Sequence, residues 1–272
     1  MSIKKTFRLA ELTMGEMKEV LPTNPVVLLP MGSFEDQGPH APTGDYLSAD
    51  AMAVKIAEAA TAKGIPTFVA PPIPFGGDDG FSASPGGITL SQSTLTAVIS
   101  DMLASLLRHG ITRIVVINGH GGNVGPIAEV ARKLYLEKKV VLPSLYLWKI
   151  SYGLLPGLIG AEKAKAVSGH GSDPLTSIGL HLFPELIRKD LIPEGKKLKN
   201  DSVLGLPYTG LGTASFDGAE VGLPMEYDDT YHDGVAGGDP KLCSAETGAV
   251  LVEKLTDIVA RFSAHFASKI KA

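Results

Sequence analysis

The sequence predicts one layered α/β domain in which a mostly parallel β-sheet is covered by helices on both faces. Three observations support this fold class. The chain has 272 residues, of which 44% are hydrophobic, enough to bury one large core. Short apolar runs alternate with longer segments of helical spacing, and parallel strands need such long crossovers. Residues suited to chemistry follow two of the apolar runs. We therefore expect residues 1–272 to form a single domain.

The predicted strands are four short runs rich in apolar and β-branched residues. Parallel strands buried on both faces have this near-continuous apolar character. The runs span residues 25–31, 67–71, 113–118 and 140–148.

The predicted helices are segments in which apolar residues recur every three to four positions. They span residues 48–63, 91–109, 125–138 and 245–269, so the first seven elements follow the order β-α-β-α-β-α-β. Residues 201–239 are rich in Gly, Asp and Tyr and have weak periodicity. We expect long loops there, and loops of that length in a compact domain are usually functional.

Composition and charge exclude several classes of function. The formal net charge is −4 and the Lys and Arg residues are scattered, so no basic surface for nucleic acid is expected. No apolar stretch approaches the roughly 18 residues of a membrane span, and the first residues lack the apolar core of a signal peptide. The single cysteine, Cys243, suits a reducing compartment, which predicts a cytoplasmic protein. The scattered charges favour a small-molecule substrate over nucleic acid.

The first candidate site follows the first predicted strand, in the segment MGSFEDQGPHAPTGDYLSAD. Carboxylates and imidazole at a strand end are suitable ligands for Zn²⁺ or Mn²⁺. The alternative is a solvated acidic loop in which the histidine caps a turn. The residues of ligand type are Glu35, Asp36, Gln37, His40 and Asp45.

The second candidate segment, INGHGGN, follows the third predicted strand and places His120 between glycines. Glycine allows close backbone approach and positive φ, so this imidazole can point into a crevice at the carboxyl edge of the sheet. The alternative is a structural turn with an incidental histidine. Because the chain lacks both GxxxxGK[ST] and GxGxxG after a strand, we do not predict a nucleotide site.

A third segment, SGHGSDPLTS, surrounds His170 with small residues. A neutral imidazole is the usual group for proton transfer near pH 7, which makes His170 a candidate general acid or base. The alternative is a hydrogen-bonded loop histidine.

Five segments of the chain resemble, in order, the signatures of the creatininase (creatinine amidohydrolase) family, and the chain is identified as a divergent member. The segments LLPMGSFEDQGPHAPTGD and INGHGGN are specific together, and the other three agree more weakly. The segments are LLPMGSFEDQGPHAPTGD, PGGITL, INGHGGN, SGHGSDPLTS and GVAGGDP.

The resemblance implies a metal centre at the carboxyl edge of the sheet, hydrolysis of an amide bond and a homo-oligomer, often a hexameric ring. The first metal site of the family corresponds to Glu35, Asp45 and His120. Three protein ligands with one open position are the set that a catalytic metal needs.

Departures from the family pattern favour one metal per chain over two. Gln37 stands where the family places a histidine for a second metal, and Leu175 stands where the family has a glutamate. Gly80 and Phe81 replace a Glu-His pair. Residues that could still supply replacement ligands are Asp36, Asp78, Asp79 and Asp173.

We predict metal-assisted hydrolysis of a C–N amide bond in a small molecule, with Zn²⁺ as the first candidate and Mn²⁺ or Fe²⁺ as alternatives. His170 is the predicted proton shuttle, and His40 is predicted to orient a ligand carboxylate. The predicted catalytic residues are Glu35, His120 and His170, the predicted metal ligands are Glu35, Asp45, His120 and Gln37, and the predicted substrate contacts are Gln37, Gly121, Gly122, Asn123 and Trp148.

Two other functions fit the same sequence. The metal site could hydrolyse a lactone or another heterocycle, or the chain could be a degenerate member that binds a metal or ligand without turnover. The pattern does not identify the substrate. Residues 208–232 form an expected loop that ends at His232, near three aspartates, and this loop could reach an active site.

Overall fold

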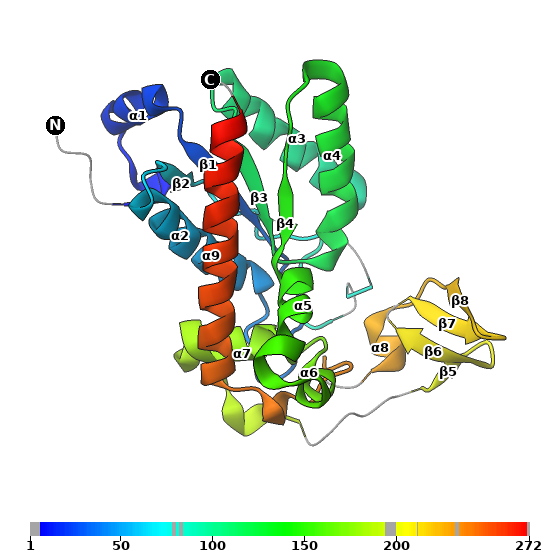
Figure 1. Ribbon diagram of the computed structural model, residues 1–272. Coiled ribbons are helices and arrows are strands. Elements are labelled where there is room, and N and C mark those ends of the chain that lie inside the picture. The colour runs from blue at the N-terminus through cyan, green and yellow to red at the C-terminus, as the bar shows by residue number, and fades with distance from the viewer. Residues whose placement is uncertain are drawn as a thin grey trace.

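The computed structural model describes residues 6–77, 80–81, 84–193, 200–210, 212–231 and 234–270. Its centre is a four-stranded sheet in the order β2-β1-β3-β4, and every neighbouring pair is parallel (Figure 1). The strands are β1 (Val26–Met31), β2 (Thr67–Val69), β3 (Ile114–Asn118) and β4 (Ser144–Tyr146).

Helices cover both faces of this sheet, and the alternation of strand side chains divides the core into two parts. Val26 and Leu28 of β1 belong to one apolar cluster, while Val27 and Leu29 belong to the other. The first cluster packs under α2 (Asp45–Ala62), α5 (Leu147–Ile159), α7 (Leu175–Leu182) and α9 (Ala245–Lys269), and the second packs under α3 (Gln92–Arg108) and α4 (Val124–Lys138).

Local capping explains where several helices begin. The side chain of Thr13 accepts from the backbone N–H of Glu16 and the Glu16 carboxylate accepts in return, which starts α1 (Met14–Val20). The side chains of Ser91 and Ser244 cap α3 and α9 by accepting from the backbone N–H groups of Thr94 and Thr247. The remaining helices are α6 (Ala161–Val167), α8 (Tyr227–Thr230) and the 3₁₀ turns Leu9–Glu11, Leu21–Thr23, Gly121–Asn123, Pro184–Leu186, Lys189–Leu191 and Pro240–Leu242.

The two central strands form a topological switch point. The chain leaves β1 through α2 on one face of the sheet, whereas it leaves β3 through α4 on the other. β1 and β3 are hydrogen-bonded neighbours, with Met31 paired to Asn118 at their carboxyl ends. The loops after these two residues diverge, and a divergence of this kind opens a crevice at the edge of the sheet.

The predicted fold class is confirmed, with one correction at the fourth strand. Residues 140–148 were expected to be a single strand, but only Ser144–Tyr146 is extended and α5 begins at Leu147. A short apolar run has the same appearance in a buried strand and in a buried helix, so the sequence pattern could not separate them. Helix α2 also begins earlier than expected, at Asp45.

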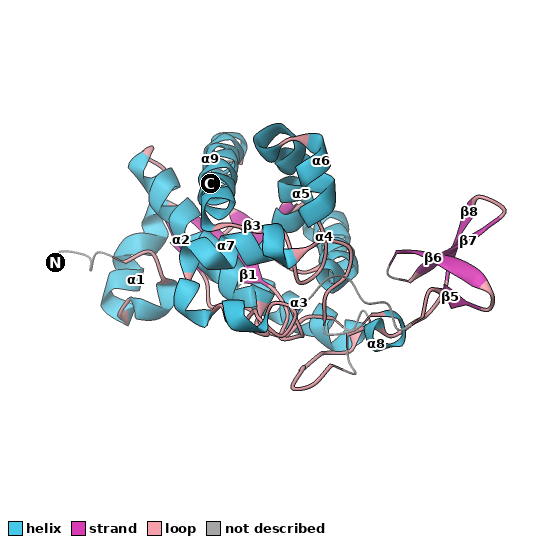
Figure 2. Ribbon diagram, turned by 90° about the horizontal axis from the view of Figure 1, so that it is seen from below, coloured by secondary structure: helices cyan, strands magenta, loops and turns pink. Residues whose placement is uncertain are grey.

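The expectation of long loops over residues 201–239 is wrong in part, because this segment contains a small antiparallel sheet. The sheet projects away from the α/β body in both views (Figures 1 and 2). Its strands, paired in sequence order, are β5 (Ser202–Val203), β6 (Leu206–Gly210), β7 (Thr213–Phe216) and β8 (Ala219–Gly222).

Two tight turns build this small sheet. Leu204 and Gly205 connect β5 to β6, and Asp217 and Gly218 connect β7 to β8, all four with positive φ. Two-residue hairpins with positive φ at both positions match the twist of the flanking strands. Asp-Gly is a strong hairpin signal, so the second turn was readable from the sequence.

Among the described residues, no helix is both long enough and apolar enough for a membrane span.

Leu204 adopts φ 54° although its side chain is 83% exposed, so the turn forces an apolar residue into a left-handed conformation without burial in return. We predict that Leu204→Asn increases the free energy of unfolding by roughly 1 kcal/mol, because Asn tolerates this conformation. Chemical denaturation measures the change. Leu204→Ala is the control, since it removes the same exposed side chain but keeps the strain. Equal stability of the two variants would contradict the prediction.

Candidate metal centre

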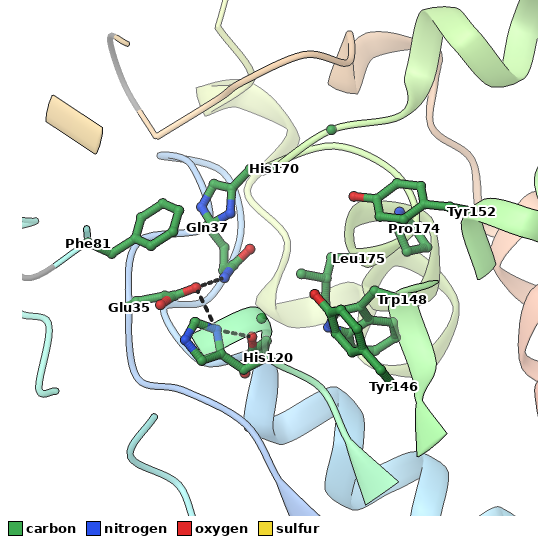
Figure 3. A pocket seen from close by; sticks show the side chains of 13 residues that line it. Glu35, Gln37, Phe81, His120, Tyr146, Trp148, Tyr152, His170, Pro174 and Leu175 are labelled. Atoms are coloured by element: carbon green, nitrogen blue, oxygen red, sulfur yellow. Dashed lines mark hydrogen bonds and ion pairs between the residues drawn. The ribbon is translucent and has the colours of Figure 1, made fainter. Parts of the chain in front are cut away.

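Glu35, Asp45 and His120 meet at the carboxyl edge of the central sheet. Glu35 lies in the loop after β1, His120 follows β3, and Asp45 is the first residue of α2. One ligand atom from each residue lies within 4.8 Å of the others, and all three side chains are buried, with 2–3% exposure. Figure 3 shows Glu35 and His120 converging on one side of a pocket.

The geometry of His120 fits a cation. Its Nε2 lies 3.4 Å from the carbonyl oxygen of Gly77, and because a carbonyl only accepts, this contact places the ring proton on Nε2. Nδ1 lies 3.2 Å from Glu35 Oε1 and 3.4 Å from Asp45 Oδ2. A lone pair that faces two buried carboxylate oxygens is stabilised by a positive ion among them, so this donor set suits a divalent metal.

The N-terminus of α2 holds Asp45 in place. Oδ1 of this carboxylate accepts a hydrogen bond of 2.5 Å from the backbone N–H of Ser33, while Oδ2 faces His120. A carboxylate is also favoured at the positive end of a helix dipole. The first loop and α2 therefore orient the ligand together.

Two buried asparagines hold the loops around His120. Asn118 Nδ2 donates to the His120 carbonyl at 2.7 Å, and its Oδ1 accepts from the His120 N–H at 3.0 Å. Asn123 accepts from the N–H of Gly77 and donates to the carbonyl of Gly32, both at 3.0 Å. These bonds join the loops after β1, β2 and β3 into one frame.

Glycine is required where these loops approach most closely. A Cβ on Gly32 would lie 2.4 Å from Asp45 Oδ1 and 2.4 Å from the backbone of Tyr46. A Cβ on Gly76 would lie 2.7 Å from His120 Cδ2. Neither position has room for a side chain unless a metal-site residue moves.

Glu35, Asp45 and His120 open onto a pocket of about 190 Å³ (Figure 3). One wall is aromatic and apolar, and the other is polar. The apolar lining is Phe81, Tyr146, Trp148, Tyr152, Pro174 and Leu175, and the remaining lining is Glu35, Gln37, Asp45, His120, Gly121, Gly169 and His170. Phe81 and Tyr146 were not singled out as pocket residues from sequence, although Tyr146 ends a strand at the edge where functional groups were expected.

His170 is held between a hydrogen bond and an aromatic stack. Its Nε2 lies 2.6 Å from the carbonyl oxygen of Asp36, so this nitrogen donates. Its ring stacks on Phe81 with centroids 4.4 Å apart, and the Tyr227 ring contacts both, with its centroid 4.7 Å from that of Phe81 and 5.1 Å from that of His170. The imidazole therefore has a fixed orientation at the pocket wall.

The other predicted site residues differ in whether they contact the candidate metal centre or line the pocket. Gln37 donates from Nε2 to Glu35 Oε1 at 3.0 Å. Trp148 lines the pocket and donates its indole N–H to the Gly119 carbonyl. Gly121 lines the pocket, whereas Gly122 and Asn123 are not among its described lining residues.

Of the aspartates considered as replacement ligands, the two described ones are engaged elsewhere. Asp36 Oδ1 accepts from the N–H of Gly38 at 2.7 Å. Asp173 Oδ1 accepts from the N–H of Ser177 at 3.1 Å, and burial raises the pKa of its carboxyl group. Three further candidates, Asp78, Asp79 and His232, lie outside the described residues.

His40 does not contact a ligand carboxylate, as its predicted orienting role required; it reaches α7 instead. Its Nε2 lies 3.0 Å from Thr176 Oγ1, and the Thr176 hydroxyl donates to the Gly171 carbonyl. Because the Thr176 hydroxyl proton is donated to the Gly171 carbonyl, Thr176 Oγ1 accepts the hydrogen bond from His40 Nε2. The His40 carbonyl also accepts from the N–H of Arg188. This buried histidine ties the first loop to the segment around α7.

Comparison with known proteins identifies the family. A family model described as creatininase, creatinine amidohydrolase, matches residues 10–263. The chain belongs to the creatininase family. The predicted family is therefore confirmed.

Several curated creatininase relatives carry different names. The chain is 27% identical over 265 residues to a 3-dehydro-scyllo-inosose hydrolase of Thermotoga maritima, covering 90% of this chain and 79% of the relative. It is 29% identical to a creatinine amidohydrolase of Pseudomonas putida over 70% of this chain and 77% of that one. A mycofactocin precursor peptide peptidase of Mycolicibacterium smegmatis is 28% identical, but the match spans only 61% of each protein.

Solved creatininase structures share the fold. A Bacteroides fragilis protein named after creatinine amidohydrolase is 25% identical, with a TM-score of 0.78 and coverage of 99% of this chain and 100% of that chain. A creatininase mutant described as Zn-Zn type is 22% identical, with a TM-score of 0.76 over 97% and 99% of the two chains. The names of the curated relatives agree with the prediction of a hydrolase.

We predict that Gly32→Ala abolishes metal binding, because the new Cβ would displace the Asp45 carboxylate and the first turn of α2. Metal content by elemental analysis and the midpoint of thermal unfolding measure the effect. Gly125→Ala is the matched control, since Gly125 lies within α4 with open space around it, where Ala is favoured. Unchanged metal content in Gly32→Ala would refute this account of the loop.

Burial lowers the pKa of His40 from 6.5 to about 4. Between these values the unfolded chain binds a proton that the folded chain does not bind. The free energy of unfolding should therefore fall as the pH decreases from 6.5 to 4, by roughly 3 kcal/mol from this group. Denaturation curves across this range test the prediction. His40→Gln should lose this part of the pH dependence, whereas His265→Gln, at an exposed position, should keep it.

Proposed function

We propose that this protein is a metal-dependent amidohydrolase that cleaves a C–N amide bond in a small molecule. The supporting observation is the buried convergence of Glu35, Asp45 and His120 on a pocket of about 190 Å³. Pockets for drug-sized ligands are larger, ~300 Å³ or more. The substrate is therefore a compact molecule, such as a cyclic amide or a formamide.

We propose one metal per chain, most simply Zn²⁺, with Mn²⁺ and Fe²⁺ compatible with the same ligands. Glu35, Asp45 and His120 form the one cluster of potential ligands found in the described part of the chain. A bound metal polarises a carbonyl and increases the acidity of water. Gln37 contacts this centre through its hydrogen bond to Glu35 Oε1 and adds no carboxylate or imidazole to it.

The protein groups around this centre have separate roles in the proposed reaction. His170 Nε2 donates to the Asp36 carbonyl, so Nδ1 would accept a proton from the attacking water and pass it to the leaving nitrogen. The N–H of Gly121, at the start of a 3₁₀ turn on the pocket wall, donates to the carbonyl oxygen as it gains charge. Trp148 and Leu175 exclude water from one side of the substrate.

The proposal extends to the oligomeric state, the cellular location and the partner of this protein. A homo-oligomer, hexameric by family resemblance, and a cytoplasmic location suited to the single thiol of Cys243 are consistent with this activity. The proposed partner is a small molecule, with no role for nucleic acid or a membrane.

The test is metal content and hydrolysis of an amide, lactam and formamide panel by the wild type and by His120→Ala. We expect close to one metal per chain in the wild type and no bound metal in the variant. The variant should lose activity by more than about 100-fold, which exceeds the loss caused by mutating residues that only hydrogen-bond to metal ligands. His265→Ala removes an exposed imidazole and should match the wild type.

The outcomes separate the parts of the proposal. Two metals per chain would refute the single-ion centre, and wild type without metal would refute the mechanism. Activity that survives His120→Ala would place the chemistry elsewhere.

A further inference from the structure

The amide of Gln37 has a fixed orientation. Its Nε2 lies 3.0 Å from Glu35 Oε1, and because an ionised carboxylate only accepts, the NH₂ group must face Glu35. The carbonyl oxygen Oε1 therefore points the opposite way. Figure 3 shows this oxygen turned away from Glu35, toward the side of the pocket where Leu175 and Trp148 lie.

This oxygen is buried without a donor. Gln37 is 2% exposed, and Oε1 finds no hydrogen-bond partner in the described part of the structure. Most buried side-chain oxygens accept a hydrogen bond, and a buried oxygen without one destabilises the folded protein. Since Gln37 lines the pocket, a bound molecule is placed to supply the missing donor.

The surroundings determine the kind of donor. Leu175 and Trp148 lie on the side that this oxygen faces, together with the neutral side chains of Tyr146 and Tyr152, and no Lys or Arg occurs among the described lining residues. The charges of Glu35 and Asp45 would be balanced by the divalent cation that these two residues and His120 are proposed to hold. A neutral N–H group fits this environment better than an ammonium group, which would bring an uncompensated charge.

The position of Gln37 indicates which N–H is recognised. Because its amide is bonded to a metal ligand, Oε1 lies beside the centre at which the scissile carbonyl must bind. In an amide, the nitrogen is one bond from that carbonyl carbon. We infer that Gln37 is a specificity-determining residue that accepts a hydrogen bond from the scissile amide nitrogen, so the enzyme selects amides bearing N–H over lactones and N-alkylated amides.

This inference rests on the proposed function and makes it narrower. A lactone places a ring oxygen, which only accepts, opposite Gln37 Oε1, and an N-methyl amide places a methyl group there. Both leave the buried carbonyl unsatisfied, and sites built to hydrogen-bond a ligand discriminate strongly against analogues that lack the donor.

Three five-membered rings of one size provide the test: 2-pyrrolidone, N-methyl-2-pyrrolidone and γ-butyrolactone. Their affinities for the metal-loaded protein are measured by NMR titration, which does not require turnover. We expect wild type to bind 2-pyrrolidone about 10-fold or more tightly than the other two. Gln37→Met, which keeps the length of the side chain but lacks the acceptor, should bind all three within about 2-fold.

A control variant and the metal content complete the experiment. His265→Gln adds an amide at an exposed position of α9 that is not among the described lining residues of the pocket, and it should keep the wild-type preference. Equal affinities in the wild type, or no binding of 2-pyrrolidone, would overturn the inference even if the metal content and the hydrolase activity are as proposed. Loss of the metal in Gln37→Met would also overturn it, because Gln37 would then act by holding the centre.

Discussion

The pairing of Met31 with Asn118 at the ends of β1 and β3 is the constraint on which the site depends. It brings together two loops that leave the sheet toward opposite faces, so Glu35 and His120 meet although they are far apart in the chain. Asp45 joins them because α2 starts there and returns over β1. The chemistry is thus positioned by the topology of the sheet, and the glycines and asparagines adjust the loops around it.

The fold class and the two segments that carry Glu35, Asp45 and His120 were predictable because both leave local signals. The selection of these three residues among their neighbours of ligand type came from the resemblance to the creatininase family. Buried parallel strands are short apolar runs, and ligand-type residues among glycines directly follow two of them. The small sheet was missed although Asp217-Gly218 is a hairpin signal, because Leu204 gives no sign of its left-handed turn. The contact of His40 with Thr176 was not predictable, since 136 positions separate the two residues and nothing local indicates the pairing.

The pocket combines a charged floor with an aromatic wall. Phe81 and Tyr227 stack behind His170, and Leu175 and Trp148 line the cavity. These apolar groups reduce the local dielectric constant, which strengthens every interaction between the polar groups and a substrate. In the same environment, a polar atom without a hydrogen-bond partner raises the free energy of the complex. The few hydrogen bonds that the pocket offers therefore determine much of its selectivity.

Asp45 is at once a proposed metal ligand and the first residue of an 18-residue helix that packs on α9 and the sheet. An ion that binds only the folded chain stabilises it by mass action, in proportion to the logarithm of the free ion concentration. Cellular metal supply would thereby influence the lifetime of the folded protein as well as its turnover. A cell starved of the ion would lose the enzyme to proteolysis, so abundance and activity would decline together.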